Sequence, residues 1–418
     1  MMSSSFGVVL AVALIGIYWA ILPESPPLDY QELVQAGNKL YGLGDSISQT
    51  PLEGRTVVIT GSTSGIGKST VSYCCKLGAT VVAMGRNSKK LRALKEEHFP
   101  CQIHSIVADH ADLHSVSKAA DTILTKFGSS SSGIDILVNN AGIHTKFEGM
   151  WKHEVTPQGY DLAFGGKNGY FYMTFIFVLR ILTNFLFPFI VNYLSHFLLT
   201  DKLLPLLQQS SKGGRVAQIS SLYHATVNGD DLSTTKSGMI AAQKGGAPGH
   251  LLWRSSRSYS NSKLAQILHA RWLQRNTENI TAVSVCPAWV ATNISGTHDM
   301  LLHDGFEKFA FDADGFGVSS VMLAIVGASA SDHSMEDTDF YINTLLAEAV
   351  LHHPIFTWIQ QFPLLLDIIG SAFAAYLFFG QRWAPVRGTG VSSPPSYNET
   401  LQDELIEWSK DAISKLYL

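Results

Sequence analysis

The fold is decided by the stretch TVVITGSTSGIG, residues Thr56–Gly67. Its β-branched start predicts a buried strand, and its three glycines let the chain turn tightly before a helix begins. A turn of this kind brings backbone N–H groups and a helix N-terminus against a pyrophosphate. The stretch therefore predicts a dinucleotide site, with cofactor contacts assigned to Gly61, Ser62, Ser64, Gly65, Ile66 and Gly67.

Short β-branched runs alternate with amphipathic segments on the C-terminal side of this turn. Helices are predicted at 68–77 and 88–97. Strands are predicted at 56–59, 80–84, 102–108, 134–138, 215–219, 281–286 and 340–343. Strands that alternate with helices form βαβ units, so we expect an α/β fold, with a doubly wound parallel sheet and helices on both faces.

Composition excludes some classes of protein. The 418 residues are 46% hydrophobic and carry a net charge of -4 without a basic stripe, so no nucleic-acid partner is expected. The four cysteines, Cys74, Cys75, Cys101 and Cys286, lack a metal-ligand spacing. We expect no metal, and we interpret the cysteines as reduced, buried thiols in a reducing compartment.

The end of the second strand indicates which dinucleotide binds. An acidic residue there would bond the ribose 2′-OH and repel a 2′-phosphate, but the chain has Arg86 followed by Asn87. The planar fork of Arg86 can pair with that phosphate, which favours NADP(H) over NAD. Asp109 closes the third strand, where it could bond the adenine edge or cap a helix.

Four polar residues suit hydride-transfer chemistry. Tyr259 and Lys263 are one helical turn apart, so a lysine ammonium could lower the pKa of the phenol, which could then exchange a proton with a carbonyl or alcohol oxygen. Ser221 follows a strand, where its hydroxyl could bond the reacting oxygen, and Asn192 could hold a water behind Lys263. Taken singly, Ser221 and Asn192 are better explained as helix caps or turn residues, but in chain order and on the expected elements the four residues reinforce one another.

Together these motifs resemble the short-chain dehydrogenase/reductase family, from about residue 54 to 294. The resemblance is carried by Thr60–Gly67, Asn139–Gly142, Ser221 and Tyr259–Lys263, and the wording of 193–200 is similar to the retinol dehydrogenase branch. It implies a seven-stranded Rossmann-type sheet and a tetrad with a water-linked proton relay. The implied tetrad is Asn192, Ser221, Tyr259 and Lys263.

The resemblance also implies roles around the cofactor. Asn139 would help to stabilise the central sheet, and Thr292, after Pro287, would contact the nicotinamide carboxamide. The cofactor contacts implied in addition to the glycine turn are Asn140, Ala141, Gly142, Tyr259, Lys263, Pro287 and Thr292.

Three features depart from the family pattern. Pro287-Ala288 replaces Pro-Gly, which stiffens the loop, and Ser221 and Tyr259 are 38 positions apart, which is long. The apolar segment Gly166–Ile190 interrupts the family's Phe-Gly-Val-Asn-Tyr join. Because both of its ends can encode splice signals that restore this join in frame, we interpret it as a translated intron, with a membrane-dipping loop as the alternative.

We divide the chain into three parts. Residues 1–50 hold the uncharged run Phe6–Leu22, which is long enough to be a membrane anchor, although a cleaved signal peptide is the alternative. Residues 51–345 form the Rossmann domain. Residues 346–418 form an apolar and amphipathic extension, with the apolar stretch 355–379 as a membrane hairpin, a lid or buried helices, then a Pro/Ser/Gly-rich loop after Arg382 and a helix over 398–417.

The expected function is NADP(H)-dependent interconversion of an apolar alcohol and its aldehyde or ketone, of retinoid, steroid or lipid type. The expected location is the endoplasmic reticulum or lipid-droplet membrane, with membrane lipid as a partner, the domain facing the cytosol, and a homodimer left open. Two alternatives remain: a cofactor-binding membrane scaffold without turnover, and an enzyme similar to light-dependent protochlorophyllide reductase.

Overall fold

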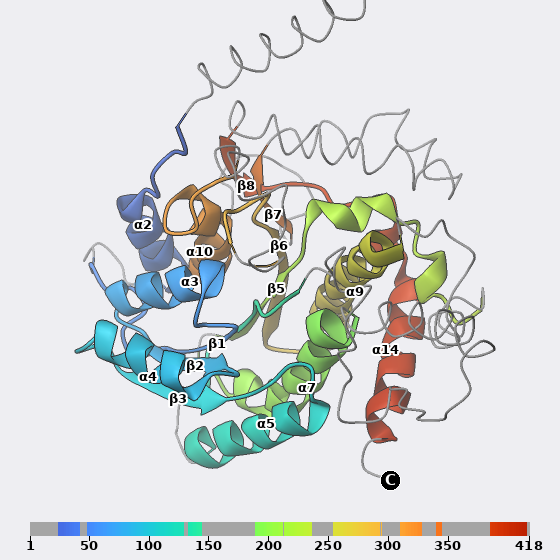
Figure 1. Ribbon diagram of the computed structural model, residues 1–418, viewed down its shortest axis with the longest axis horizontal. Helices are drawn as coiled ribbons and strands as arrows, with labels where there is room; N and C mark the ends of the chain where they lie inside the picture. The colour runs from blue at the N-terminus through green and yellow to red at the C-terminus, as the bar shows by residue number, and fades with distance from the viewer. Residues whose placement is uncertain are drawn as a thin grey trace, which may run out of the picture.

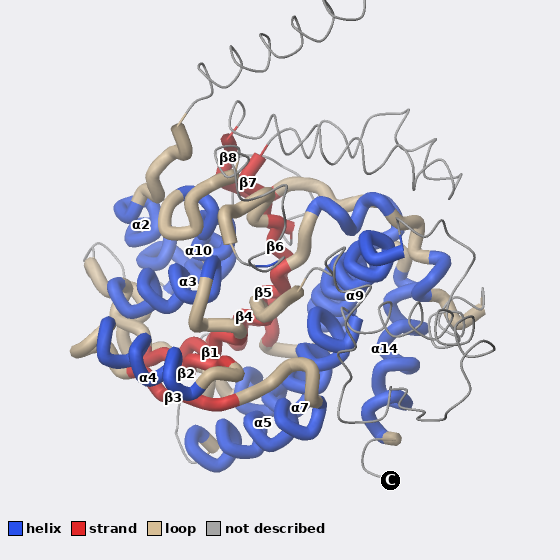
Figure 2. Tube along the Cα trace, viewed as in Figure 1, coloured by secondary structure: helices blue, strands red, loops and turns tan. Residues whose placement is uncertain are grey.

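The computed structural model describes residues 24–41, 48–128, 133–143, 189–211, 213–235, 254–292, 294, 310–327, 340–344 and 385–415. At its centre is an eight-stranded sheet in the order β3-β2-β1-β4-β5-β6-β7-β8 (Figures 1 and 2). The strands are β1 (Thr56–Thr60), β2 (Thr80–Gly85), β3 (Ile103–Val107), β4 (Ile136–Asn139), β5 (Gly214–Ile219), β6 (Ile280–Cys286), β7 (Phe340–Thr344) and β8 (Pro385–Thr389).

The helices form a layer on each face of this sheet. The α-helices are α2 (Tyr30–Tyr41), α3 (Gly65–Lys76), α4 (Ser88–Glu97), α5 (Leu113–Phe127), α7 (Ser195–Gln208), α9 (Arg254–Asn276), α10 (Ser319–Val326) and α14 (Glu399–Ser414). A π-helical turn, η2 (Ile190–Leu194), precedes α7, and the short 3₁₀ helices are η3 (Leu222–Thr226), η4 (Asp230–Leu232), η7 (Phe316–Val318) and η9 (Pro394–Tyr397).

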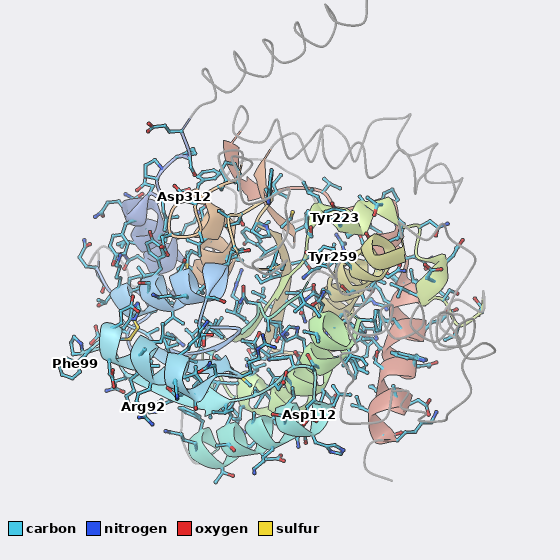
Figure 3. All side chains as sticks on the ribbon, viewed as in Figure 1. Arg92, Phe99, Asp112, Tyr223, Tyr259 and Asp312 are labelled. Carbon is cyan, nitrogen blue, oxygen red and sulfur yellow. A yellow bond between two sulfur atoms is a disulfide. The ribbon has the colours of Figure 1, made fainter. Side chains whose placement is uncertain are left out.

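Two hydrophobic cores hold the layers to the sheet. Successive side chains of a strand point to opposite faces. Val57 and Ile59 therefore pack against α2, α3, α4 and α10, while Val58 packs against α5, α7, α9 and α14. Side chains fill the space between the layers (Figure 3). Because both faces are covered, every residue of β1 is buried, as the sequence predicted.

Seven of the eight strands run parallel, which confirms the expected doubly wound sheet. The eighth strand corrects a prediction. Residues Pro385–Thr389, assigned to a loop, form β8, which pairs antiparallel with β7. Local propensity disfavours a strand with Pro385 and Gly388, but an edge strand tolerates both because its outer side needs no ladder partner.

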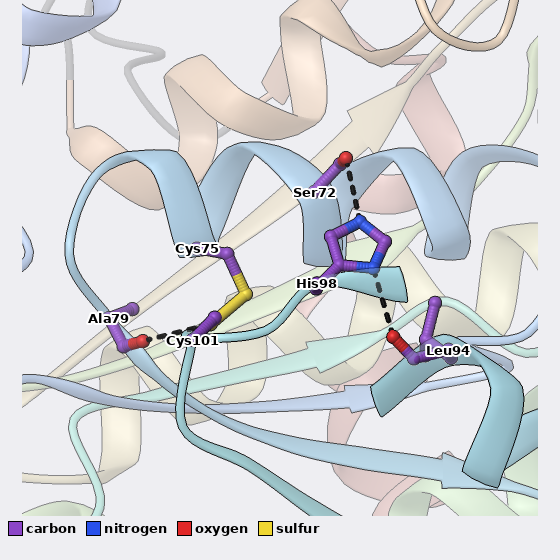
Figure 4. The surroundings of a disulfide bond; sticks show 6 residues. All are labelled: Ser72, Cys75, Ala79, Leu94, His98 and Cys101. Carbon is purple, nitrogen blue, oxygen red and sulfur yellow. Dashed lines mark hydrogen bonds between the residues drawn. A yellow bond between two sulfur atoms is a disulfide. The ribbon is translucent and has the colours of Figure 1, made fainter. Parts of the chain in front are cut away.

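The prediction of four reduced cysteines is wrong for two of them. Cys75, near the end of α3, forms a disulfide with Cys101, just before β3 (Figure 4). The bond was not evident in the sequence because the two residues are 26 positions apart and meet only once α3 and β3 pack on the same strand, β2. Cys74 and Cys286 are free and buried, as expected. The inference of a reducing compartment loses its basis.

Several expected segments lie outside the described residues. They are the anchor Phe6–Leu22, the apolar stretch 355–379 and all of Gly166–Ile190 except its last two residues. Among the helices that the structure does describe, none combines the length and apolarity that a bilayer crossing requires.

A buried ion pair holds the residues at the start of β1 in place. Asp135, just before β4, accepts from Arg55 Nη1 at 2.9 Å, from the Thr56 N–H at 2.8 Å and from the Ser210 hydroxyl at 2.7 Å. The Asp135 side chain is 4% exposed. One carboxylate therefore joins the start of β1 to the turn after α7.

We predict that Asp135→Asn lowers the free energy of unfolding by about 3 kcal/mol, because it removes the buried carboxylate charge that faces Arg55. The control is Asp121→Asn, whose carboxylate is 60% exposed and pairs with Lys202; it should cost less than about 1 kcal/mol. Urea unfolding compares the two variants, and equal losses would contradict the assignment.

Candidate active site

The glycine turn is built so that no side chain fits inside it. A Cβ on Gly67 would lie 2.3 Å from the carbonyl oxygen of Gly61. Gly61 and Gly65 have φ values of +66° and +51°, which favour glycine. Ser64 begins α3 without a side-chain cap from the described residues. The first N–H groups of α3 therefore remain available to an anion.

Neighbouring residues hold this turn in place. Ser62 is buried and its hydroxyl donates to the Met84 carbonyl at 3.0 Å, which joins the ends of β1 and β2. Asn140 Nδ2 donates to the Thr60 carbonyl at 2.8 Å. The Thr60 hydroxyl in turn accepts from the N–H groups of Asn140 and Ala141, both at 2.9 Å. The ends of β1, β2 and β4 thus form one rigid edge.

Asn139 acts between layers. Its Nδ2 donates to the Thr200 hydroxyl of α7 at 2.9 Å, and it is fully buried. Its side chain thus anchors a helix to β4, which is a concrete form of the stabilising role that the family resemblance implied.

The loop after β6 reaches the same edge. A Cβ on Gly65 would lie 2.8 Å from Cγ2 of Thr292, so Thr292 packs directly on the glycine turn. Ala288, which follows Pro287, has a φ of +62°. An alanine held there is strained by about 1–2 kcal/mol. The alanine in place of glycine therefore does more than stiffen the loop.

The residues expected to choose the dinucleotide lie at the neighbouring strand ends. Arg86 is exposed after β2. Asn87 caps α4 by accepting from the Lys90 N–H at 3.0 Å. Asp109, after β3, accepts from the Ala111 N–H at 3.0 Å in a local turn, and Asp112 is the residue that caps α5. Asp109 is therefore not the helix cap that was its alternative reading.

Tyr259, Ser221 and Lys263 converge where β5 and β6 end. Tyr259 lies on α9 against Tyr223 of η3, with ring centroids 5.6 Å apart (Figure 3). Its phenol shares a side-chain hydrogen bond with Ser221. Lys263 Nζ lies 5.3 Å from the centroid of the Tyr259 ring and donates to the Ile219 carbonyl at 2.8 Å. It also donates to Gln266 Oε1 at 3.0 Å.

Burial controls the charge of this group. It raises the pKa of the Tyr259 phenol above its ordinary value, and the Ser221 hydrogen bond only partly opposes it. Burial also lowers the pKa of Lys263 to about 7. An ammonium removed from water is itself only partly charged at neutral pH, so burial opposes the lowering of the Tyr259 pKa that was expected from Lys263. That lowering stays a prediction for the site with its oxidised cofactor.

Asn192 lies in the π-helical turn η2, a distortion often found at functional sites. Its side chain bonds both backbone groups of Ile143, at 2.8 and 3.0 Å, and the Ser262 hydroxyl at 3.0 Å. A Cβ on Gly142 would lie 3.4 Å from Asn192 Oδ1 and 3.6 Å from Lys263 Nζ. Asn192 and Lys263 thus flank one glycine, and a relay water between them stays a proposal.

Three buried residues at this site were missed by sequence reasoning. Gln266 accepts from Lys263. His196 Nδ1 donates to the Asn192 carbonyl at 2.9 Å, and its Nε2 lies 3.0 Å from the Thr60 hydroxyl. His224 contacts the Ser221 carbonyl. Nothing in the local pattern distinguishes these side chains from ordinary core residues; only their tertiary partners do.

Comparison with known proteins agrees with this geometry. The sequence model of the short chain dehydrogenase family matches residues 55–164. Human retinol dehydrogenase 14 is 29% identical over 59% of the chain and 65% of its own length. Human polyprenol dehydrogenase is 28% identical over 58% of the chain and 63% of its own length. The match thus covers less than two thirds of either relative.

A solved structure of an uncharacterised Mycobacterium paratuberculosis protein supports the fold. It covers 86% of this chain and 93% of its own, with a TM-score of 0.51 and 22% identity. The chain is therefore similar to the short-chain dehydrogenase/reductase family through the match over residues 55–164. Its relatives include the retinol dehydrogenases, human retinol dehydrogenase 13 among them at 28% identity.

We predict that Gly67→Ala weakens dinucleotide binding by about tenfold or more, because the new methyl group forces backbone apart at the turn. Gly54→Ala is the matched control. Gly54 has a φ of +75° with nothing within 4 Å of its Cβ position, so alanine adds strain without a contact. Titration of NADPH fluorescence gives both affinities. A Gly67→Ala chain that binds like wild type would show that the turn does not hold the cofactor.

Proposed function

We propose that the chain is an NADP(H)-dependent oxidoreductase that interconverts an apolar alcohol and its aldehyde or ketone. The observation that carries the proposal is the placement of Ser221 and Tyr259 at the carboxyl edge of the sheet, beside the glycine turn. Ligands of open α/β sheets bind at this edge, so substrate and cofactor would meet there.

The residues present fit a nicotinamide dinucleotide. Gly61 and Gly67 form a cradle that a Cβ would fill, and the uncapped start of α3 suits a pyrophosphate. Asn140 holds the cradle, and Thr292 lies against it. When bound, the cofactor supplies or accepts a hydride.

Arg86 supports NADP(H) over NAD(H). It is exposed directly after β2, where the family's dinucleotides place the ribose 2′ position, and the turn Gly85–Asn87 contains no acidic residue. A guanidinium can form two parallel hydrogen bonds to a phosphate, and no carboxylate is present to repel that phosphate.

The chain's own groups divide the acid–base work. Ser221 donates a hydrogen bond to the carbonyl oxygen and polarises it. Tyr259 then gives its proton to that oxygen, and a raised pKa suits this direction because it keeps the phenol protonated at neutral pH. Lys263, whose pKa is about 7, can pass a proton back to the phenolate. In the oxidative direction the same transfers run in reverse.

The apolar substrate class rests on similarity. Two relatives are named for retinol and polyprenol, both long isoprenoid alcohols, and this chain is 29% and 28% identical to them over 59% and 58% of its length. We also retain as proposals the membrane anchor at Phe6–Leu22, attachment at the endoplasmic reticulum or lipid droplets with membrane lipid as partner, and the homodimer.

The interpretation of 166–190 as a translated intron stays a proposal. The structure of the last two residues of this segment is compatible with it. Phe189 and Ile190 are buried at the start of η2. Excision of 166–190 would put Phe164 and Gly165 directly before Val191, so that Phe164 would take the sequence position of Phe189. The aromatic side chain that packs on Tyr193 would be retained. Sequencing of the mature message decides whether this segment exists in the protein.

We predict NADPH-linked reduction of retinal or another apolar carbonyl, with a lower rate for NADH. Tyr259→Phe should lower kcat by about 100-fold or more, because the proton donor is lost, while NADPH affinity stays unchanged. Tyr223→Phe is the matched control, since it removes a neighbouring phenol, and should cost less than about tenfold. NADPH binding without turnover of any carbonyl would instead favour the scaffold.

A further inference from the structure

A buried histidine in the loop that follows β5 and contains Ser221, here the Ser221 loop, takes no part in the proposed reaction. His224 lies in η3 and is fully buried. Its Nδ1 is 2.6 Å from the Ser221 carbonyl oxygen, which also accepts from the His224 backbone N–H at 3.0 Å. Its Nε2 is 3.0 Å from the backbone nitrogen of Ser393. The ring therefore joins two parts of the chain that are 169 positions apart.

The two partners fix the proton on this ring. A carbonyl oxygen can only accept and a backbone N–H can only donate. Nδ1 must therefore carry the ring proton, and Nε2 must be unprotonated so that it can accept. The His224 ring is therefore neutral. Burial agrees, since it lowers the pKa of His224 to about 4. The His224 ring is thus in one defined tautomer, and each of its two nitrogens has a hydrogen-bond partner.

The C-terminal segment Gly390–Tyr397 is itself firmly held. Ser392, Ser393 and Ser396 are fully buried. The Ser392 hydroxyl accepts from Arg271 Nη2 at 3.2 Å, and the Arg271 guanidinium lies 3.7 Å from the centroid of the Tyr397 ring. Arg271 belongs to α9, the helix that carries Tyr259 and Lys263. The segment is therefore anchored to the helix that carries Tyr259 and Lys263. It can hold the ring of His224 in one position.

The same extension also touches the loop beyond η3. Glu404 of α14 accepts from the Ser233 hydroxyl at 2.8 Å and from the Thr234 N–H at 2.9 Å. Helix α14 lies beside α9 (Figure 1). The C-terminal residues therefore contact the Ser221 loop at Ser233, Thr234 and His224, and His224 is the contact that lies beside Ser221.

We propose that His224 is a positioning residue through which the C-terminal segment fixes the Ser221 peptide and hence the direction of the Ser221 hydroxyl. The role rests on the proposed function, in which that hydroxyl holds the reacting oxygen. Rotation of this peptide would move the hydroxyl away from Tyr259, and small misplacements of reacting groups cost large factors in rate.

Two substitutions cut the link at opposite ends. His224→Gln can place its Oε1 where Nε2 accepts from the Ser393 N–H, but it removes the ring Nδ1 that donates to the Ser221 carbonyl. Ser393→Pro removes that N–H, and the Ser393 φ of -65° already suits proline. Ser393→Ala is the matched control, because it keeps the N–H and deletes a hydroxyl that has no partner among the described residues.

The test is steady-state carbonyl reduction by the full chain, together with NADPH affinity and melting temperature. His224→Gln and Ser393→Pro should each lower kcat about 10–100-fold, with KM and NADPH affinity within about threefold of wild type. The double variant should cost no more than the larger single loss, since both cut one link. Ser393→Ala should behave like wild type.

Other results overturn the role. Wild-type kcat in His224→Gln would do so, as would equal behaviour of Ser393→Pro and Ser393→Ala. Losses confined to KM, NADPH affinity or melting temperature would show a merely structural histidine. A wild-type chain that binds NADPH yet reduces no carbonyl would overturn the proposed function itself, which is a distinguishable failure.

Discussion

The contact between the start of α3 and the end of β1 leaves room only for hydrogen atoms. A side chain on Gly67 would collide with the Gly61 carbonyl, so helix and strand approach as closely as backbone allows. The Thr60 hydroxyl then gathers the N–H groups of Asn140 and Ala141 and meets the ring of His196. Loop geometry at the ends of β1 and β4 depends on this approach, and His196 links Thr60 to the carbonyl of Asn192 in the π-helical turn.

Burial is the second constraint on the site. Tyr259 and Lys263 are 6% and 2% exposed, so each is driven toward its neutral form. A protonated phenol and a partly neutral amine make a good proton-donating pair, and they suit carbonyl reduction. Tyr259 and Lys263 therefore add little charge of their own, and most of the charge in this site would come from a bound cofactor. The same dryness protects a transferred hydride from water.

The sequence was sufficient to predict those elements whose pattern lies within a few consecutive residues. The β-branched run before Gly61 and the alternation after it predicted seven parallel strands, and strand ends then placed Arg86, Asp109, Asn140 and Ser221 on one edge. Contacts between distant residues could not be predicted in this way. The antiparallel pairing of β8, the Cys75–Cys101 bond and the Ser393 contact with His224 each join segments that only the fold brings together. The burial that raises the pKa of Tyr259 could not be predicted for a related reason, because periodicity does not reveal how deeply a side chain lies in the fold.

Transfer of deuterium from NADPH that carries deuterium at both C4 positions tests the central claim most directly. Wild-type protein, labelled NADPH and retinal are incubated, and the mass of the alcohol is measured. One deuterium on the former carbonyl carbon is the predicted result, because the proposed function has substrate and cofactor meet at the carboxyl edge of the sheet. An alcohol that forms without deuterium, or cofactor that is consumed without alcohol, would contradict a direct hydride transfer at this site.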